Sequence, residues 1–79
     1  MSIVDDLTAW EEETGYLPGA LSLYITPPWN KIHPETKFWE YLDIAIKRLT
    51  HLEKVDSLSR DEKDFLDHFE PINREYWGF

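Results

Sequence analysis

The stretch of residues 33–55 constrains the fold more than any other part of the chain, because its apolar residues recur at a helical interval. Successive steps of four, three, four and three residues are typical of one face of an α-helix. They connect Phe38, Leu42, Ala45, Leu49 and Leu52. Pro34 suits a first helical turn, where its missing amide hydrogen is not needed. The sequence therefore predicts a helix over residues 34–55.

The apolar surface of this predicted helix is unusually wide. Trp39 and Ile46 flank the stripe on one side, and Tyr41 and Ile44 flank it on the other. At about 100° per residue the apolar arc covers about 220°, whereas an ordinary surface helix buries a stripe of roughly 100°. One neighbouring helix does not cover such an arc. We therefore expect a central helix surrounded by the rest of the chain, with coverage by a second molecule as an open alternative.

A second helix is predicted over Ile3–Thr14 at the start of the chain. Ile3, Leu7 and Trp10 follow each other at steps of four and three residues, and Gly15 provides a helix stop. The opposite face carries several acidic residues. This face is interpreted either as solvated surface, which is the commoner case, or as a docking surface for a basic partner.

A third helix is predicted over residues 60–69. Ser59 and Glu62 have the spacing of a capping box, which marks the helix start. Pro71 lacks the amide donor and clashes with the preceding turn, so we expect the helix to break or kink near Glu70. The apolar phase nevertheless continues beyond the proline, through Phe65, Phe69, Ile72 and Tyr76. A short, offset helical turn is therefore expected at the C-terminal end.

Residues 16–32 are expected to wrap over the core as a long connection. Gly15, Pro18 and Gly19 interrupt any long helix there. Apolar and polar residues alternate over residues 20–26 as in a strand, but no second strand is predicted that could pair with it. A loop or a short helical turn is the preferred interpretation, with the strand left open. The two prolines predict extended backbone over residues 26–29. Trp29 then either covers the core or is an exposed anchor.

These elements define an all-α class: a small three-helix bundle with a long central helix, forming one domain over residues 1–79. A core this small needs large side chains, and the chain supplies four Trp, four Tyr and four Phe. There is no cysteine, so disulfides and Cys-based zinc sites are excluded. No basic and apolar leader follows Met1, and no apolar run reaches the ~20 residues of a membrane helix. We expect a cytoplasmic protein without membrane contact.

The formal net charge of −8 restricts the kinds of partner. An acidic surface repels phosphate backbones, so direct nucleic-acid binding is not expected. A protein with a basic surface is the complementary partner, because opposite fields speed encounter. The alternative is that the acidity only keeps an aromatic-rich domain in solution.

The sequence shows no motif for catalysis, and no cofactor or metal ion is predicted. His33, His51 and His68 do not have the spacing of paired metal ligands. Asp64 and His68 share a helix face, but such faces are more often solvated than metal-bound. A Gly-x-Ser-x-Gly elbow and a Gly-rich phosphate loop are both missing from the sequence. An enzyme is therefore the least favoured class.

The resulting functional hypothesis is a small acidic interaction module that inhibits or regulates a larger, basic-surfaced protein. Antitoxin or immunity proteins, and virus-encoded inhibitors of host defence or transcription machinery, are of this type. The alternative is a homo-oligomeric scaffold, most simply a homodimer, built on the central helix. The candidate aromatic contacts are Trp29, Tyr24, Trp77 and Phe79. The candidate acidic contacts are Asp6, Glu12, Glu13, Asp64 and Asp67.

Overall fold

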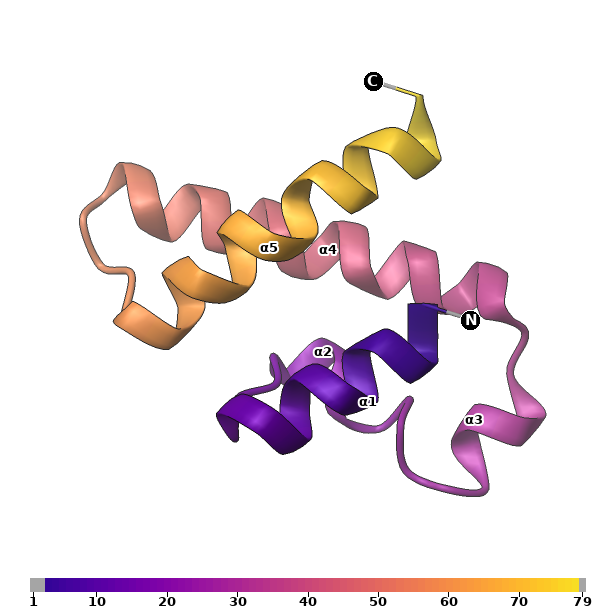
Figure 1. Ribbon diagram of the computed structural model, residues 1–79. Helices are drawn as coiled ribbons and strands as arrows, with labels where there is room; N and C mark the ends of the chain where they lie inside the picture. The colour runs from indigo at the N-terminus through magenta and orange to yellow at the C-terminus, as the bar shows by residue number, and fades with distance from the viewer. Residues whose placement is uncertain (1–2, 79) are drawn as a thin grey trace.

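Two long helices, α4 (Glu35–Lys54) and α5 (Arg60–Trp77), form the frame of the protein in the computed structural model (Figure 1). The structure describes residues 3–78. The other helices are α1 (Ile3–Thr14) and two single turns, α2 (Gly19–Ser22) and α3 (Trp29–Ile32). Residues 3–78 contain no strand, so the predicted all-α class is confirmed, although with five helices in place of three.

The long helix α4 is central, as its apolar pattern predicts, and its bounds lie within one residue of the predicted ones. Its buried residues are Phe38, Leu42, Ala45, Ile46 and Leu49. α5 and α2 both pack against α4. On the α5 side, the Trp39 ring stacks on Tyr76 with 3.9 Å between ring centroids. On the α2 side, Tyr41 packs against Tyr24 and Trp29. Two neighbours therefore cover most of the wide apolar arc.

The N-terminal helix α1 has the predicted bounds and contributes Ile3 and Leu7 to the core. The Trp10 ring stands edge-on to Phe65 and Phe69 of α5, at centroid distances of 6.4 and 5.5 Å. Gly15 ends the helix in the left-handed region, at φ 74°. Only glycine adopts this conformation without a steric cost, which explains why the helix stops here.

The predicted break in α5 is wrong. The helix starts at the predicted capping box, where Ser59 Oγ accepts from the Glu62 amide at 3.3 Å. It then continues through Pro71 and ends at Trp77, before Gly78. The proline removes one hydrogen bond and costs about 3 kcal/mol in a helix interior. The packing of the turns after the proline, including the Trp39–Tyr76 stack, offsets this cost because they continue the same apolar phase.

The segment between α1 and α4 contains the two single turns α2 and α3, in line with the preferred interpretation of a loop or a short helical turn over residues 20–26. Leu21 and Tyr24 are buried and lie three residues apart, which is a helical interval and excludes the strand. Extended backbone over residues 26–29 is also wrong, because the Trp29 amide donates to the Thr26 carbonyl at 3.0 Å and closes a turn. The prolines restrict the backbone as predicted, but that restriction is compatible with a turn as well as with an extended chain.

A buried polar group that the sequence analysis does not identify ties α5 to α4. Asn73 is the one buried polar residue in the described part of the chain. Its amide donates to Asp43 Oδ1 at 3.2 Å, and its carbonyl oxygen accepts from the Trp77 indole at 3.1 Å. Asp43 in turn pairs with Lys47 at 2.9 Å. This network fixes the C-terminal turns of α5 on α4, because buried polar groups are costly without partners.

Candidate functional site

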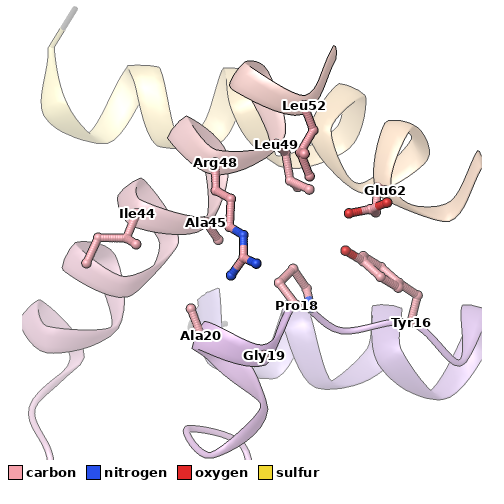
Figure 2. A pocket seen from close by; sticks show the side chains of 10 residues that line it. All are labelled: Tyr16, Pro18, Gly19, Ala20, Ile44, Ala45, Arg48, Leu49, Leu52 and Glu62. Atoms are coloured by element: carbon pink, nitrogen blue, oxygen red, sulfur yellow. The ribbon is translucent and has the colours of Figure 1, made fainter. Parts of the chain in front are cut away.

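A surface cavity of about 250 Å³ lies between α2 and α4, with the first turn of α5 at one end (Figure 2). It is lined by Tyr16, Pro18, Gly19, Ala20, Ile44, Ala45, Arg48, Leu49, Leu52 and Glu62. Figure 2 shows the Arg48 side chain reaching across the cavity toward the start of α2. At the other end, the Tyr16 hydroxyl and the Glu62 carboxylate point toward each other. The floor is apolar, and the polar groups lie at the rim.

A second cavity, of about 190 Å³, adjoins the first and shares Gly19 and Ala20 with it. Its remaining lining residues are Leu23, Tyr24, Trp29 and Tyr41. We call the two cavities together the α2–α4 groove, since they share these two residues of α2. It runs from Trp29 and Tyr41 at one end to Arg48 and Glu62 at the other.

The groove exists because α2 is too short to cover its side of α4. This single helical turn packs against α4 but leaves Ile44 56% exposed. On α2's own outer edge, Leu23 is 63% exposed. Each large apolar side chain gains about 1.5–3 kcal/mol on full burial. Ile44 and Leu23 therefore favour a contact with another apolar surface.

The two charged groups at the Arg48 end of the groove differ in their partners. The Glu62 carboxylate accepts a hydrogen bond from the Ser59 amide at 3.0 Å, which fixes its position as part of the helix cap. The Arg48 guanidinium is exposed and makes no ion pair within residues 3–78. It is therefore available to a carboxylate or carbonyl group of a bound molecule.

The electrostatics at this end of the groove act on the Tyr16 hydroxyl. Burial raises the pKa of Tyr16 above its ordinary value, and the carboxylates of Glu62 and Asp61 raise it further. Arg48 opposes this effect, since a nearby cation favours the phenolate. Tyr16 is therefore a neutral hydrogen-bonding group at physiological pH.

The predicted aromatic contact residues that the structure describes lie in three different places. Trp29 is half-buried and forms a groove wall, with its ring 5.5 Å from that of Tyr24. Trp77 is 40% exposed and lies at the end of α5, away from the groove. Tyr24 is only 2% exposed, and its hydroxyl donates to the backbone carbonyl of Pro34, so it belongs to the core and not to a contact surface. Phe79 lies outside the described residues.

The five predicted acidic contacts are all exposed but do not form one patch. Asp6 and Glu13 lie on one rim of a hollow between α1 and α5, of about 240 Å³, opposite His68. Asp67 lies in a different depression, between α4 and α5. Glu12 is on the outward face of α1, and Asp64 lies one turn before His68 on α5. The acidic residues therefore produce a broad field rather than a single binding site.

The predicted pair of Asp64 and His68 does not form part of a metal-binding group. Among residues 3–78, no three His, Asp or Glu side chains are placed so that they could hold a metal ion together. The His68 ring instead stacks on Trp10, with 4.7 Å between ring centroids. His68 therefore has a packing role on the surface of the core.

The sequence analysis does not identify Leu23, Ile44 or Arg48 as site residues, although it places Ile44 at the edge of the apolar arc. Their exposure follows from the shortness of α2, and a four-residue helix has too little periodicity to be predicted.

None of the helices described over residues 3–78 is long and apolar enough to cross a membrane. Comparison of the chain with protein-family models, with curated proteins and with solved structures gives no significant match.

Proposed function

We propose that this protein is a small interaction module that binds a larger, basic-surfaced protein and thereby inhibits or regulates it. The observation that carries the proposal is the α2–α4 groove, whose apolar lips are Leu23 and Ile44. Exposed apolar side chains around a concave surface are typical of protein-binding sites. The half-buried ring of Trp29 and the unpaired cation of Arg48 add the two residue types that most often dominate binding energy.

The size of the protein supports inhibition by steric blocking. Its accessible surface is 5318 Å², and a standard interface buries about 800 Å² on each partner. About one seventh of the surface is therefore enough for a stable complex. An interface of this size would extend beyond the groove to the residues around it, and the rest of the molecule would then cover the neighbouring surface of the partner.

The acidic residues have a separate role in the proposal. Asp6, Glu12, Glu13, Asp64 and Asp67 are exposed and spread over α1 and α5. A broad negative field accelerates encounter with a basic surface, whereas the groove determines how long the complex lasts. Antitoxin, immunity and virus-encoded inhibitor proteins act in this way. The cysteine-free composition suits a reducing compartment such as the cytoplasm.

The test compares capture of the partner by the wild type and by Leu23→Asp/Ile44→Asp. Both side chains are more than half exposed, so the double variant should fold. The matched control is Ile32→Asp/Val55→Asp, in which two apolar residues of similar exposure, 69% and 53%, are changed outside the groove. We expect one protein from the native cell to bind the wild type and the control, and to be lost with the groove variant.

Salt dependence tests the electrostatic part of the same proposal. Affinity for the captured partner should fall as ionic strength rises, because exposed charges are screened within about 10 Å at 0.1 M salt. Equal capture by the groove variant and the wild type would refute the groove as the binding site. Affinity that does not change with salt would refute steering by the acidic residues.

A second candidate function is a homo-oligomeric scaffold built on α4. The observation that favours it is the exposed Ile44 on the outward side of this helix.

A further inference from the structure

Acidic and basic residues are separated between two faces of the protein. The outward side of α1 carries exposed acidic residues around Ala9, and we call it the acidic face; its residues are Asp5, Asp6, Ala9, Glu12 and Glu13. No Lys, Arg or His occurs in α1. The acidic face therefore has no cation of its own helix to offset it, and the basic side chain beside it is His68 of α5, across the hollow bordered by Asp6, Ala9 and Glu13.

The outward side of α4 has the opposite charge. Its exposed residues, which we call the α4 outward face, are Lys37, Glu40, Ile44, Lys47, Arg48, His51, Lys54 and Val55. Four of the chain's eight Lys and Arg residues lie here, beside the carboxylates of Glu40 and the half-buried Asp43. Lys37 pairs with Glu40 at 3.6 Å and Lys47 with Asp43 at 2.9 Å, whereas Arg48 and Lys54 make no ion pair within residues 3–78. Ile44 is the apolar side chain at the centre of this face.

The two faces point away from each other. The buried sides of α1 and α4 meet in the same core, through Leu7 of α1 and Leu42 of α4 among others. The outward sides therefore face away from this shared core, on different sides of the molecule. The charges cannot neutralise each other within one molecule. A contact between them has to join two molecules.

The spacing of the residues makes the faces complementary. On α4, Lys47 and Arg48 follow Ile44 by one helical turn. On α1, an acidic pair lies one turn before Ala9 and another lies one turn after it. With Ala9 placed against Ile44, an acidic pair meets Lys47 and Arg48 whichever way the helices run. Glu40 then lies near the other acidic pair, where Lys37 offsets its charge.

We propose that the protein self-associates head to tail, with the acidic face of one copy on the α4 outward face of the next. The small side chain of Ala9 lets the helices approach to the usual 8–10 Å while Ile44 is buried between them. Because the two surfaces differ, the contact is heterologous and each added copy leaves both kinds of face free at the ends. This association rests on the second candidate function proposed above, the homo-oligomeric scaffold built on α4, and does not depend on the regulatory one. It covers Ile44, however, and so competes with a partner for one lip of the α2–α4 groove.

Sedimentation velocity at several protein concentrations, at low and at high salt, tests this proposal. Two variants each remove one face: Arg48→Glu/Lys54→Glu reverses cations on α4, and Glu12→Lys/Glu13→Lys reverses acids on α1. We expect wild-type mass to rise with concentration at low salt and to fall at high salt. Each variant alone should be monomeric. An equimolar mixture of the two should associate again, since the acidic face of the α4 variant still fits the α4 outward face of the α1 variant and the two reversed faces also carry opposite charges.

The matched control is Arg60→Glu/Lys63→Glu, which gives the same net charge as the α4 variant but changes exposed residues of α5. It should assemble like the wild type. A wild type that stays monomeric at every concentration in low salt overturns the proposal. So does a mixture that stays monomeric although circular dichroism shows both variants folded, or an α1 variant that associates like the wild type. Leu23→Asp, which damages only the groove, should still self-associate, so the two proposals fail separately.

Discussion

At the scale of single residues, buried polar and partly buried titratable groups determine how the helices are held. Asn73 satisfies Asp43 and Trp77 at once, so one side chain fixes the relative position of α4 and α5. Tyr16 places a neutral hydroxyl at the Arg48 end of the groove, because burial and the nearby carboxylates of Glu62 and Asp61 raise its pKa. Neither role is encoded in a sequence pattern, since each depends on residues from different helices.

Replacing Asn73 with Ala should destabilise the protein by about 1–3 kcal/mol, because Asp43 Oδ1 and the Trp77 indole each lose a hydrogen-bond partner. Urea unfolding followed by circular dichroism measures this change. Arg74→Ala is the control, since it removes only an exposed pair with Glu70 and should cost less than about 1 kcal/mol. Equal effects of the two substitutions would show that the Asn73 network does not hold α5.

Replacing Glu62 with Gln should lower the pKa of Tyr16 toward its ordinary value of about 10. Glutamine keeps the capping geometry with Ser59 but removes the negative charge. In the wild type, the stability linked to neutral Tyr16 is complete below pH 10 and is lost as pH rises through the raised pKa. NMR titration of isotope-labelled tyrosines at alkaline pH measures the shift. A Tyr16 pKa that does not change would show that Glu62 does not act on the hydroxyl.

At the scale of elements, the sequence predicts the helices whose apolar pattern repeats over several turns. It fails where tertiary packing determines the end of a helix, and where a helix is only one turn long. α1 and α4 are predicted almost to the residue, because their apolar stripes extend over several turns. The end of α5 is missed because the local effect of Pro71 is outweighed by packing on α4, which a sequence does not show. α2 and α3 are single turns without a measurable period. Of the groove residues, only Trp29 and the buried Tyr24 are predicted as contacts, since exposure of Ile44 depends on how little of α4 is covered by α2.

Replacing Pro71 with Ala should stabilise the protein. The new amide can donate to the Asp67 carbonyl one turn earlier. The restored hydrogen bond and the relief of the proline clash together contribute up to about 3 kcal/mol. Greater freedom of the unfolded chain offsets about 0.4–1 kcal/mol of this gain. The urea midpoint of the variant measures the net effect. A lower midpoint would mean that the proline is required for the path of α5.

At the scale of the whole molecule, the account rests on an uneven covering of α4. α5 and α1 bury one side of it, α2 covers a second side incompletely, and the outward side stays in solvent. The incomplete cover produces the α2–α4 groove, and the exposed side produces a basic face opposite the acidic face of α1. Both proposed contacts therefore arise from the same wide apolar helix in a chain with few segments to surround it.

The affinity of the captured partner for Leu23→Asp/Ile44→Asp, measured by calorimetry beside urea unfolding of the same variant, tests this account most directly. We predict a loss of at least about 30-fold in affinity, since two contact residues at about 1–2 kcal/mol each are removed. The urea midpoint should stay close to that of the wild type, because both side chains are largely exposed. Unchanged affinity, or a midpoint that falls as it does for a core substitution, would contradict the groove as an exposed binding surface.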